Sequence, residues 1–139
     1  MRDEQDSIRI CGNSSCVALA TVLSEEDRIS LILPLFLELA TDNSWRVRFT
    51  TVTQIGDICS LFPKGIIETR ILPEYLRLMQ DPELEVRTGA AGSISKICAH
   101  LDASVIIDQV VNIIDELSND PSEHVRIALA GDFLSRNQE

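Results

Sequence analysis

Few side chains in this sequence have the types and spacing that catalysis or metal binding requires. The two histidines, His100 and His124, stand in no His-Glu or His-x-x-x-His pattern, so they do not supply the paired ligands of a helical metal site. They also accompany no nucleophile motif, which leaves a serine or cysteine triad without support. No cysteine belongs to a C-x-x-C pair, and we expect free buried thiols at Cys11, Cys16, Cys59 and Cys98. We therefore expect no enzyme, no cofactor and no metal.

Charged residues recur at a constant spacing, and this regularity is the strongest signal in the chain. Four segments, DEQDSIR, DNSWRVR, DPELEVR and DPSEHVR, begin at residues 3, 42, 81 and 120, a step of 39 residues each time. Because these charged residues occupy the same position in every unit, they indicate a structural role in a repeat protein. We expect a ladder in which each arginine pairs with a turn carboxylate of the neighbouring repeat, each exposed pair contributing about 0–1 kcal/mol. The ladder residues are Arg9, Arg48, Arg87, Arg126, Asp42, Asp81 and Asp120.

The residues between these segments follow a helical period. One run places its apolar side chains at i, i+3, i+4, i+7 and i+10, namely Ile29, Ile32, Leu33, Phe36 and Leu39. The spacing predicts a helix before each charged turn, here named the A helix, and a second helix after it, the B helix. The chain then contains B1, A2, B2, A3, B3, A4 and B4, and no strand pattern competes.

The turns carry residues that favour a helix start. Asp81-Pro82 and Asp120-Pro121 predict a capping carboxylate followed by a proline at the first helical position, and Glu123 lies at a capping-box spacing. Glycines in the B helices leave two interpretations open. They either allow neighbouring helices to approach closely or are tolerated in slightly weak helices. These glycines are Gly89, Gly92 and Gly131.

Composition restricts the class of protein further. Hydrophobic residues make up 45% of the chain and aromatic residues only 4%, which predicts an aliphatic core between close-packed helices. The formal net charge of −10 opposes binding to nucleic acid or to anionic membranes. The acidic start MRDEQD does not resemble a signal peptide, and no stretch reaches the ~20 apolar residues of a membrane span. We expect a cytoplasmic protein, with room for a nuclear pool.

The repeats predict one all-α domain over residues 1–139, an α-solenoid of helical hairpins. Residues 1–24 form the second helix of a truncated repeat, and 25–63, 64–102 and 103–139 are full repeats. Terminal repeats of solenoids normally have polar outer faces. Neither end shows one, so we expect a fragment of a longer solenoid whose cut ends self-associate.

An aspartate in the hairpin turn followed by Val-Arg is typical of HEAT repeats. Within that class, DEQDSIR (Asp3 to Arg9) and SWRVRF (Ser44 to Phe49) resemble the scaffolding A subunits of protein phosphatase 2A, a similarity that extends from about Asp3 to Gly131. The resemblance implies a right-handed superhelical stack whose turns form a ridge. It also implies that regulatory, B-type subunits bind the middle repeats represented here, while the catalytic subunit binds repeats absent from this chain. Repeats three and four match more loosely.

Turn positions that differ between repeats are the candidates for partner recognition. Trp45 and Arg46 have residue types enriched in binding hot spots. Their positions differ from repeat to repeat while the flanking residues recur, which favours a specific contact with a partner. The alternative is a tryptophan packed in the groove between repeats beside a solvated arginine. The full candidate set is Asp6, Ser7, Ser44, Trp45, Arg46, Glu83, Glu85, Glu123 and His124.

Three functions follow from these features. The first is a non-catalytic scaffold of the phosphatase holoenzyme, which holds a regulatory subunit near the catalytic subunit. The second is a general HEAT-repeat adaptor in transport, chromatin or translation. The third, a metal-dependent hydroxylase on a HEAT-like fold, requires repeated His-Glu pairs, which this sequence lacks.

Overall fold

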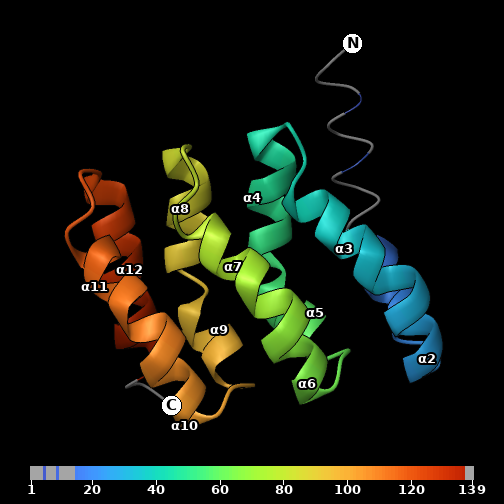
Figure 1. Cartoon of the computed structure of the whole chain (residues 1–139). Coiled ribbons are helices and arrows are strands. Elements are labelled where there is room, and N and C mark those ends of the chain that lie inside the picture. The colour runs from blue at the N-terminus through green and yellow to red at the C-terminus, as the bar shows by residue number, and fades with distance from the viewer. Residues whose placement is uncertain (1–4, 6–8, 10–14, 137–139) are drawn as a thin grey trace.

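The computed structural model describes residues 5, 9 and 15–136, and within this part of the chain every regular element is a helix. The helices form hairpins that stand side by side in a row, from α2 and α3 at one end to α11 and α12 at the other (Figure 1). The first helix of each hairpin lies on one side of the row and the second on the opposite side. The predicted all-α, stacked-hairpin architecture is confirmed.

Each A helix contains a wider, π-helical turn near its start. The bounds are α2 (Glu25–Asp27), η1 (Arg28–Ile32) and α3 (Leu33–Ala40); α6 (Lys64–Ile66), η2 (Ile67–Ile71) and α7 (Leu72–Leu78); and α10 (Ala103–Val105), η3 (Ile106–Val110) and α11 (Val111–Ser118).

Proline explains this turn only in part. In the first two A helices the turn ends two residues before Pro34 or Pro73, and a proline ring crowds the carbonyl four residues before it. A wider turn relieves that contact. The third A helix has Asn112 at the same position and forms the same turn, with the Val111 N–H bonded to the carbonyl of Ile106. The π turn therefore belongs to the packing of the repeat and does not require proline.

The B helices consist of two pieces in the second and third repeats. Their bounds are α4 (Trp45–Thr53) with α5 (Ile55–Cys59), α8 (Leu84–Ala91) with α9 (Ile94–Cys98), and the unbroken α12 (Glu123–Arg136). Helix periodicity predicted one continuous helix in each case, so that expectation is wrong for these two repeats. At the breaks, Gln54 and Ser93 have ψ angles of 8° and 5°, and their N–H groups bond only three residues back.

The turn aspartates do not cap the B helices in the predicted way. Helix α8 begins at Leu84, two residues after Pro82, and its N-cap residue is Glu83. Asp81 instead accepts a hydrogen bond from the Glu83 N–H at 3.0 Å, which closes the turn before the helix starts. Glu123 is itself the first residue of α12, so the predicted capping box is wrong as well.

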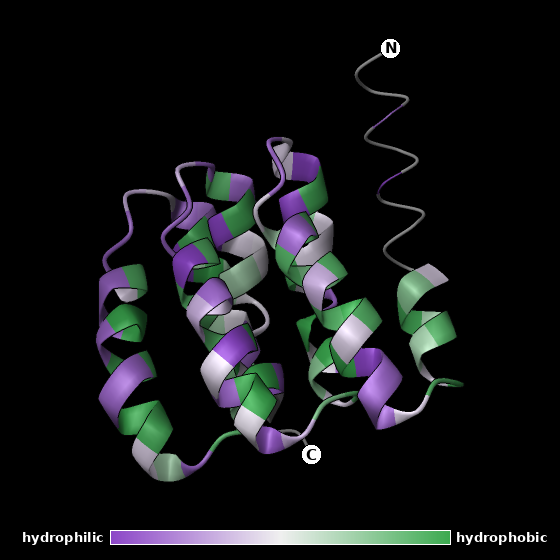
Figure 2. Cartoon of the chain, turned by 45° about the vertical axis from the view of Figure 1, so that its right-hand side comes forward, coloured by the Kyte–Doolittle hydropathy of each residue, from purple (hydrophilic) through white to green (hydrophobic). Residues whose placement is uncertain are grey.

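The core is one continuous apolar cluster that runs through the stack. Hydrophobic and hydrophilic residues alternate along its helices (Figure 2). Tyr75 is fully buried, and its hydroxyl donates to the carbonyl of Ala90. Burial raises the pKa of Tyr75 well above its ordinary value, so the phenol stays protonated. Cys59 is a buried free thiol, Cys98 is buried and Cys16 is half-buried, while Cys11 lies outside the described residues. Burial raises the pKa of Cys59 to about 12, which makes its thiol unreactive.

The glycines divide between the two interpretations. A Cβ atom added to Gly89 would lie 3.0 Å from the Phe49 ring and 3.2 Å from Val52, so this glycine allows α4 and α8 to approach closely. Gly92 ends α8, and a Cβ at Gly131 would meet no atom within 4 Å. Of these three glycines, only Gly89 is explained by the close approach of a neighbouring helix.

Candidate partner-binding ridge at the hairpin turns

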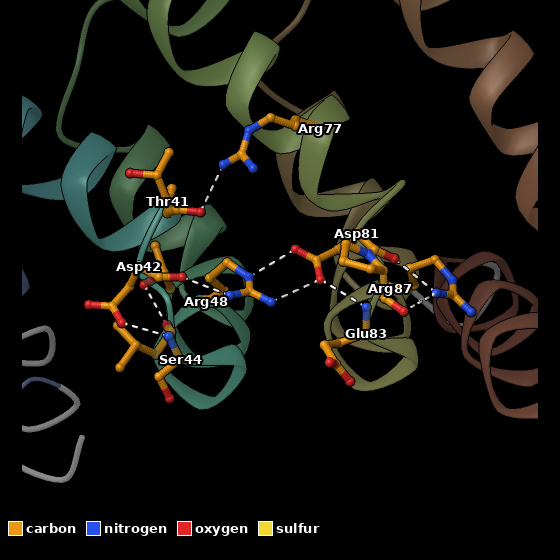
Figure 3. Close-up of polar contacts among 12 residues, drawn as sticks. Thr41, Asp42, Ser44, Arg48, Arg77, Asp81, Glu83 and Arg87 are labelled. Atoms are coloured by element: carbon orange, nitrogen blue, oxygen red, sulfur yellow. Dashed lines mark hydrogen bonds and ion pairs between the residues drawn. The ribbon is translucent and has the colours of Figure 1, made fainter. Parts of the chain in front are cut away.

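Consecutive turns are joined by an arginine that reaches from one repeat to the aspartate of the next (Figure 3). Arg48 donates from Nε to Asp81 Oδ2 at 2.9 Å and from Nη2 to Asp81 Oδ1 at 3.2 Å. Its third nitrogen, Nη1, donates to the carbonyl of Asp42 in its own turn at 2.7 Å. One guanidinium thus holds two neighbouring turns at a fixed separation.

The same arrangement recurs along the row. Arg87 pairs with Asp120 at 2.9 and 3.3 Å and donates to the Asp81 carbonyl at 2.8 Å. Arg9 pairs with Asp42 at 2.9 Å. Arg48 and Asp81 are nearly excluded from solvent, with side-chain exposures of 12% and 3%, so their interaction is stronger than that of a surface pair.

Each turn aspartate also closes its own turn. Oδ1 of Asp42 accepts from the Ser44 N–H at 2.8 Å, and Oδ1 of Asp120 accepts from the Ser122 N–H at 2.9 Å. Burial by itself would raise the pKa of Asp120. The Ser122 N–H, the bound Arg87 and the charge of Arg126 outweigh burial and hold this pKa below its ordinary value. Arg126 is exposed and donates to the Asp120 carbonyl.

The structure shows further inter-repeat contacts that sequence reasoning missed. Asp132 is buried and accepts from both the N–H and the hydroxyl of Ser95, at 2.9 and 2.6 Å, at the start of α9. Arg77 donates to the carbonyl of Ala40 at 2.9 Å. Neither residue type recurs at the 39-residue step, so a search for repeated columns could not find them.

Trp45 and Arg46 lie together at the start of α4. Trp45 is half-buried and packs against the core cluster, while Arg46 is exposed and places its guanidinium 5.6 Å from the centre of the Trp45 ring. This is a cation–π distance. The ring therefore packs partly on the core, and partner contact by Trp45 and Arg46 stays a prediction.

The other candidate residues occupy the same ridge in different environments. Ser44 is half-buried as the N-cap residue of α4. Glu83, Glu123 and His124 are exposed, and Glu85 is half-exposed beside them. Asp6 and Ser7 lie outside the described residues. The structure thus presents a row of polar side chains on turns of fixed spacing.

The arginine–aspartate pairs of the ladder hold neighbouring turns at a fixed separation. Among residues 15–136 no group of three or more His, Cys, Asp or Glu side chains is placed to hold a metal ion. No helix in the same part of the chain is long and apolar enough to cross a membrane.

Stacked hairpins joined by a turn ladder define a HEAT-repeat α-solenoid, a class that generally acts as a non-catalytic scaffold. A family model described as PPP2R1A-like HEAT repeat matches residues 64–135, just over half of the 139 residues. A HEAT repeat model matches residues 32–62. The chain therefore belongs to the PPP2R1A-like HEAT-repeat family. No curated protein sequence matches the chain significantly.

Proposed function

We propose that this chain is a scaffold of a protein phosphatase 2A holoenzyme, and that its turn ridge binds a regulatory subunit. The match of residues 64–135 to the PPP2R1A-like HEAT repeat carries the proposal. The SWRVRF and DEQDSIR turns support it, because they resemble the same family and lie outside that range.

The ladder gives the proposal a physical basis. Pairs such as Arg48–Asp81 fix the spacing of successive turns, so a partner that contacts several turns meets a preorganised surface. The residues that vary between turns, Trp45 and Arg46 among them, then provide specificity. In this proposal the chain is not an enzyme, acts in the cytoplasm, and reaches the catalytic subunit through repeats beyond this sequence.

Calorimetric titration with purified regulatory subunits of each class tests this function. We expect saturable binding to at least one class, and no phosphoester hydrolysis that follows the chain through purification. Absence of binding to every class would favour the second function, a general HEAT-repeat adaptor, which the HEAT repeat match over residues 32–62 supports equally well.

A further inference from the structure

Several exposed residues of α12 occupy positions that contact the following repeat elsewhere in the stack. Gly56 and Ser95 share one such position in α5 and α9. A Cβ added to Gly56 would lie 3.2 Å from Lys96 of α9, and Ser95 donates two hydrogen bonds to Asp132 of α12. Leu134 lies 39 residues after Ser95, at the same position in α12, and its side chain is 65% exposed.

Two further positions of α12 follow the same rule. Val52 is fully buried and lies 3.2 Å from a Cβ added to Gly89 of the next repeat, whereas Ala130, at the same position in α12, is exposed. Ile127 is 60% exposed and takes the position of Phe49, whose ring meets the same glycine. Helix α12 therefore presents, uncovered, the surface that α4 packs against α8. We name it the α12 face, and it consists of Ile127, Ala130 and Leu134.

The helix of residues 15–20, at the opposite end of the row, presents the surface that receives such a face (Figure 1). Ala18 is exposed and occupies the position of Lys96, which meets Gly56 of the preceding repeat. Leu19 is 54% exposed, whereas Ile58, at the same position in α5, is buried. We name Ala18 and Leu19 the 15–20 face. The two ends of the row thus expose the two halves of the contact that joins neighbouring repeats.

The residue sizes at this contact are complementary between two copies of the chain. Inside the stack, the small Gly56 meets the long side chain of Lys96. Between copies the order is reversed, because the large Leu134 takes the glycine position and the small Ala18 takes the lysine position. Close packing needs the summed volume of facing residues to be kept, and this exchange keeps it roughly constant.

The charged ladder continues in the same register. Arg48 and Arg87 each bind the aspartate 33 residues later. Arg126 is exposed and makes no ion pair with any carboxylate that the structure describes. One further step of 39 residues places Asp3 of a second copy at the aspartate position that faces Arg126; Asp3 itself lies outside the described residues. Opposite charges at the two ends favour head-to-tail contact.

From this geometry we infer that the α12 face of one copy docks head-to-tail on the 15–20 face of a second copy of this chain. The second copy continues the row in the register of the repeats, with Leu134 against Ala18 and Leu19. Because the two faces differ, the interface is heterologous and does not close at two copies, so assembly proceeds beyond a dimer. The inference is independent of the proposed function, which concerns the turn ridge.

Sedimentation equilibrium of the 139-residue chain over a range of protein concentrations tests this assembly. We expect an average mass that increases with concentration and exceeds that of a dimer. Leu134→Asp places a charge in the α12 face, and Ala18→Asp places one in the 15–20 face. Each variant alone should self-associate at least about tenfold more weakly than the wild-type chain.

A mixture of the two variants distinguishes head-to-tail docking from pairing of like faces. Leu134→Asp keeps an intact 15–20 face, and Ala18→Asp keeps an intact α12 face. In equal amounts they should form a dimer that grows no further, because each retains the face that the other lacks. Leu31→Asp is the matched control, since Leu31 is an exposed leucine of η1 whose position is also exposed in the other repeats, at Arg70 and Gln109. It should assemble like the wild-type chain.

Leu134→Ala tests the same contact with a change that adds no charge, and it should weaken assembly about threefold or more. Three results would overturn the inference. They are a wild-type chain that stays monomeric at every concentration, a dimer formed by either aspartate variant alone, and equal weakening by Leu31→Asp. A regulatory subunit that fails to bind leaves this assembly intact and removes only the proposed function.

Discussion

One carboxylate in each turn has two structural tasks. Oδ1 of Asp81 accepts from the Glu83 N–H and from Arg48, while Oδ2 accepts from Arg48 alone. The same side chain therefore closes its own turn and joins it to the preceding repeat. This double use explains why aspartate recurs at the 39-residue step, since a longer glutamate could not close the turn in the same way.

Removal of the Asp81 charge should be far more damaging than removal of an exposed charge. Asp81→Asn leaves the nearly buried guanidinium of Arg48 without a counter-ion, which should lower the free energy of unfolding by about 3 kcal/mol. Asp102→Asn is the control, because the Lys64–Asp102 pair also joins separate helices, the start of α6 and the N-cap of α10, but has side-chain exposures of 52% and 58%. That change should cost less than about 1 kcal/mol. Urea denaturation measures both, and equal losses would contradict a buried ladder.

The lowered pKa of Asp120 predicts a dependence of stability on pH. Its folded pKa lies below the unfolded value of about 3.9, so its contribution is fully present above that value and is lost as pH falls through the folded pKa. Asp120→Asn should therefore have a lower urea midpoint than the wild-type chain at pH 7. The difference between the two midpoints should become smaller below about pH 4. A difference that stays constant from pH 7 to pH 3 would exclude this role.

At the scale of the element, the sequence predicted helix identity well and helix continuity poorly. The period of Ile29, Ile32 and Leu33 located the first A helix, because apolar spacing reflects the face that packs on the core. At the break between α8 and α9, Asp132 of the following repeat accepts hydrogen bonds from the N–H and the hydroxyl of Ser95. Local periodicity contains no information about such a contact.

The ladder residues were predictable because they recur at the 39-residue step, whereas Asp132 does not recur. Arg48 and Arg87 make identical contacts in each repeat, so their function appears as a repeated column. Exposure was less predictable, because only burial in the folded chain distinguishes Phe49 or Leu84 from core residues.

Gly89 should be the least replaceable glycine of the second helices. Gly89→Val places new atoms against Phe49 and the buried Val52, where the added Cβ already has contacts of 3.0–3.2 Å. We expect a loss of about 1–3 kcal/mol from overpacking. Gly65→Val is the control, since a Cβ there meets nothing within 4 Å, and it should change stability by less than about 0.5 kcal/mol. Thermal melts of the two variants measure the difference, and similar melting temperatures would show that α4 and α8 can separate without cost.

At the scale of the molecule, stability is distributed along a row of repeats. Helix α8 packs against α4 on one side and α12 on the other, so the third repeat has neighbours at both faces. In such a stack each repeat is stabilised by its nearest neighbours. The chain should therefore open from its outer repeats.

Hydrogen exchange tests this order of opening. We expect the slowest exchange in α7, α8 and the adjacent α9, and faster exchange in α11 and α12, which have a neighbouring repeat on one side only among the described residues. Uniform protection of all these helices would instead indicate a single cooperative unit.

Charge reversal at Arg46 tests most directly whether the turn ridge binds a phosphatase regulatory subunit. Arg46 is exposed above the Trp45 ring, so Arg46→Glu should leave the melting temperature nearly unchanged, whereas Trp45→Ala removes a ring that also packs against the core. The control is Val47→Ala, which truncates a fully buried side chain and should reduce stability while folded protein still binds.

The decisive measurement is calorimetric titration of each variant with the regulatory subunit, at a temperature where all of them are folded. We predict that Arg46→Glu weakens binding by about 2 kcal/mol, roughly 30-fold, while Val47→Ala keeps the wild-type affinity. Unchanged affinity in Arg46→Glu, or no binding by the wild-type chain, would contradict binding of a regulatory subunit at this ridge.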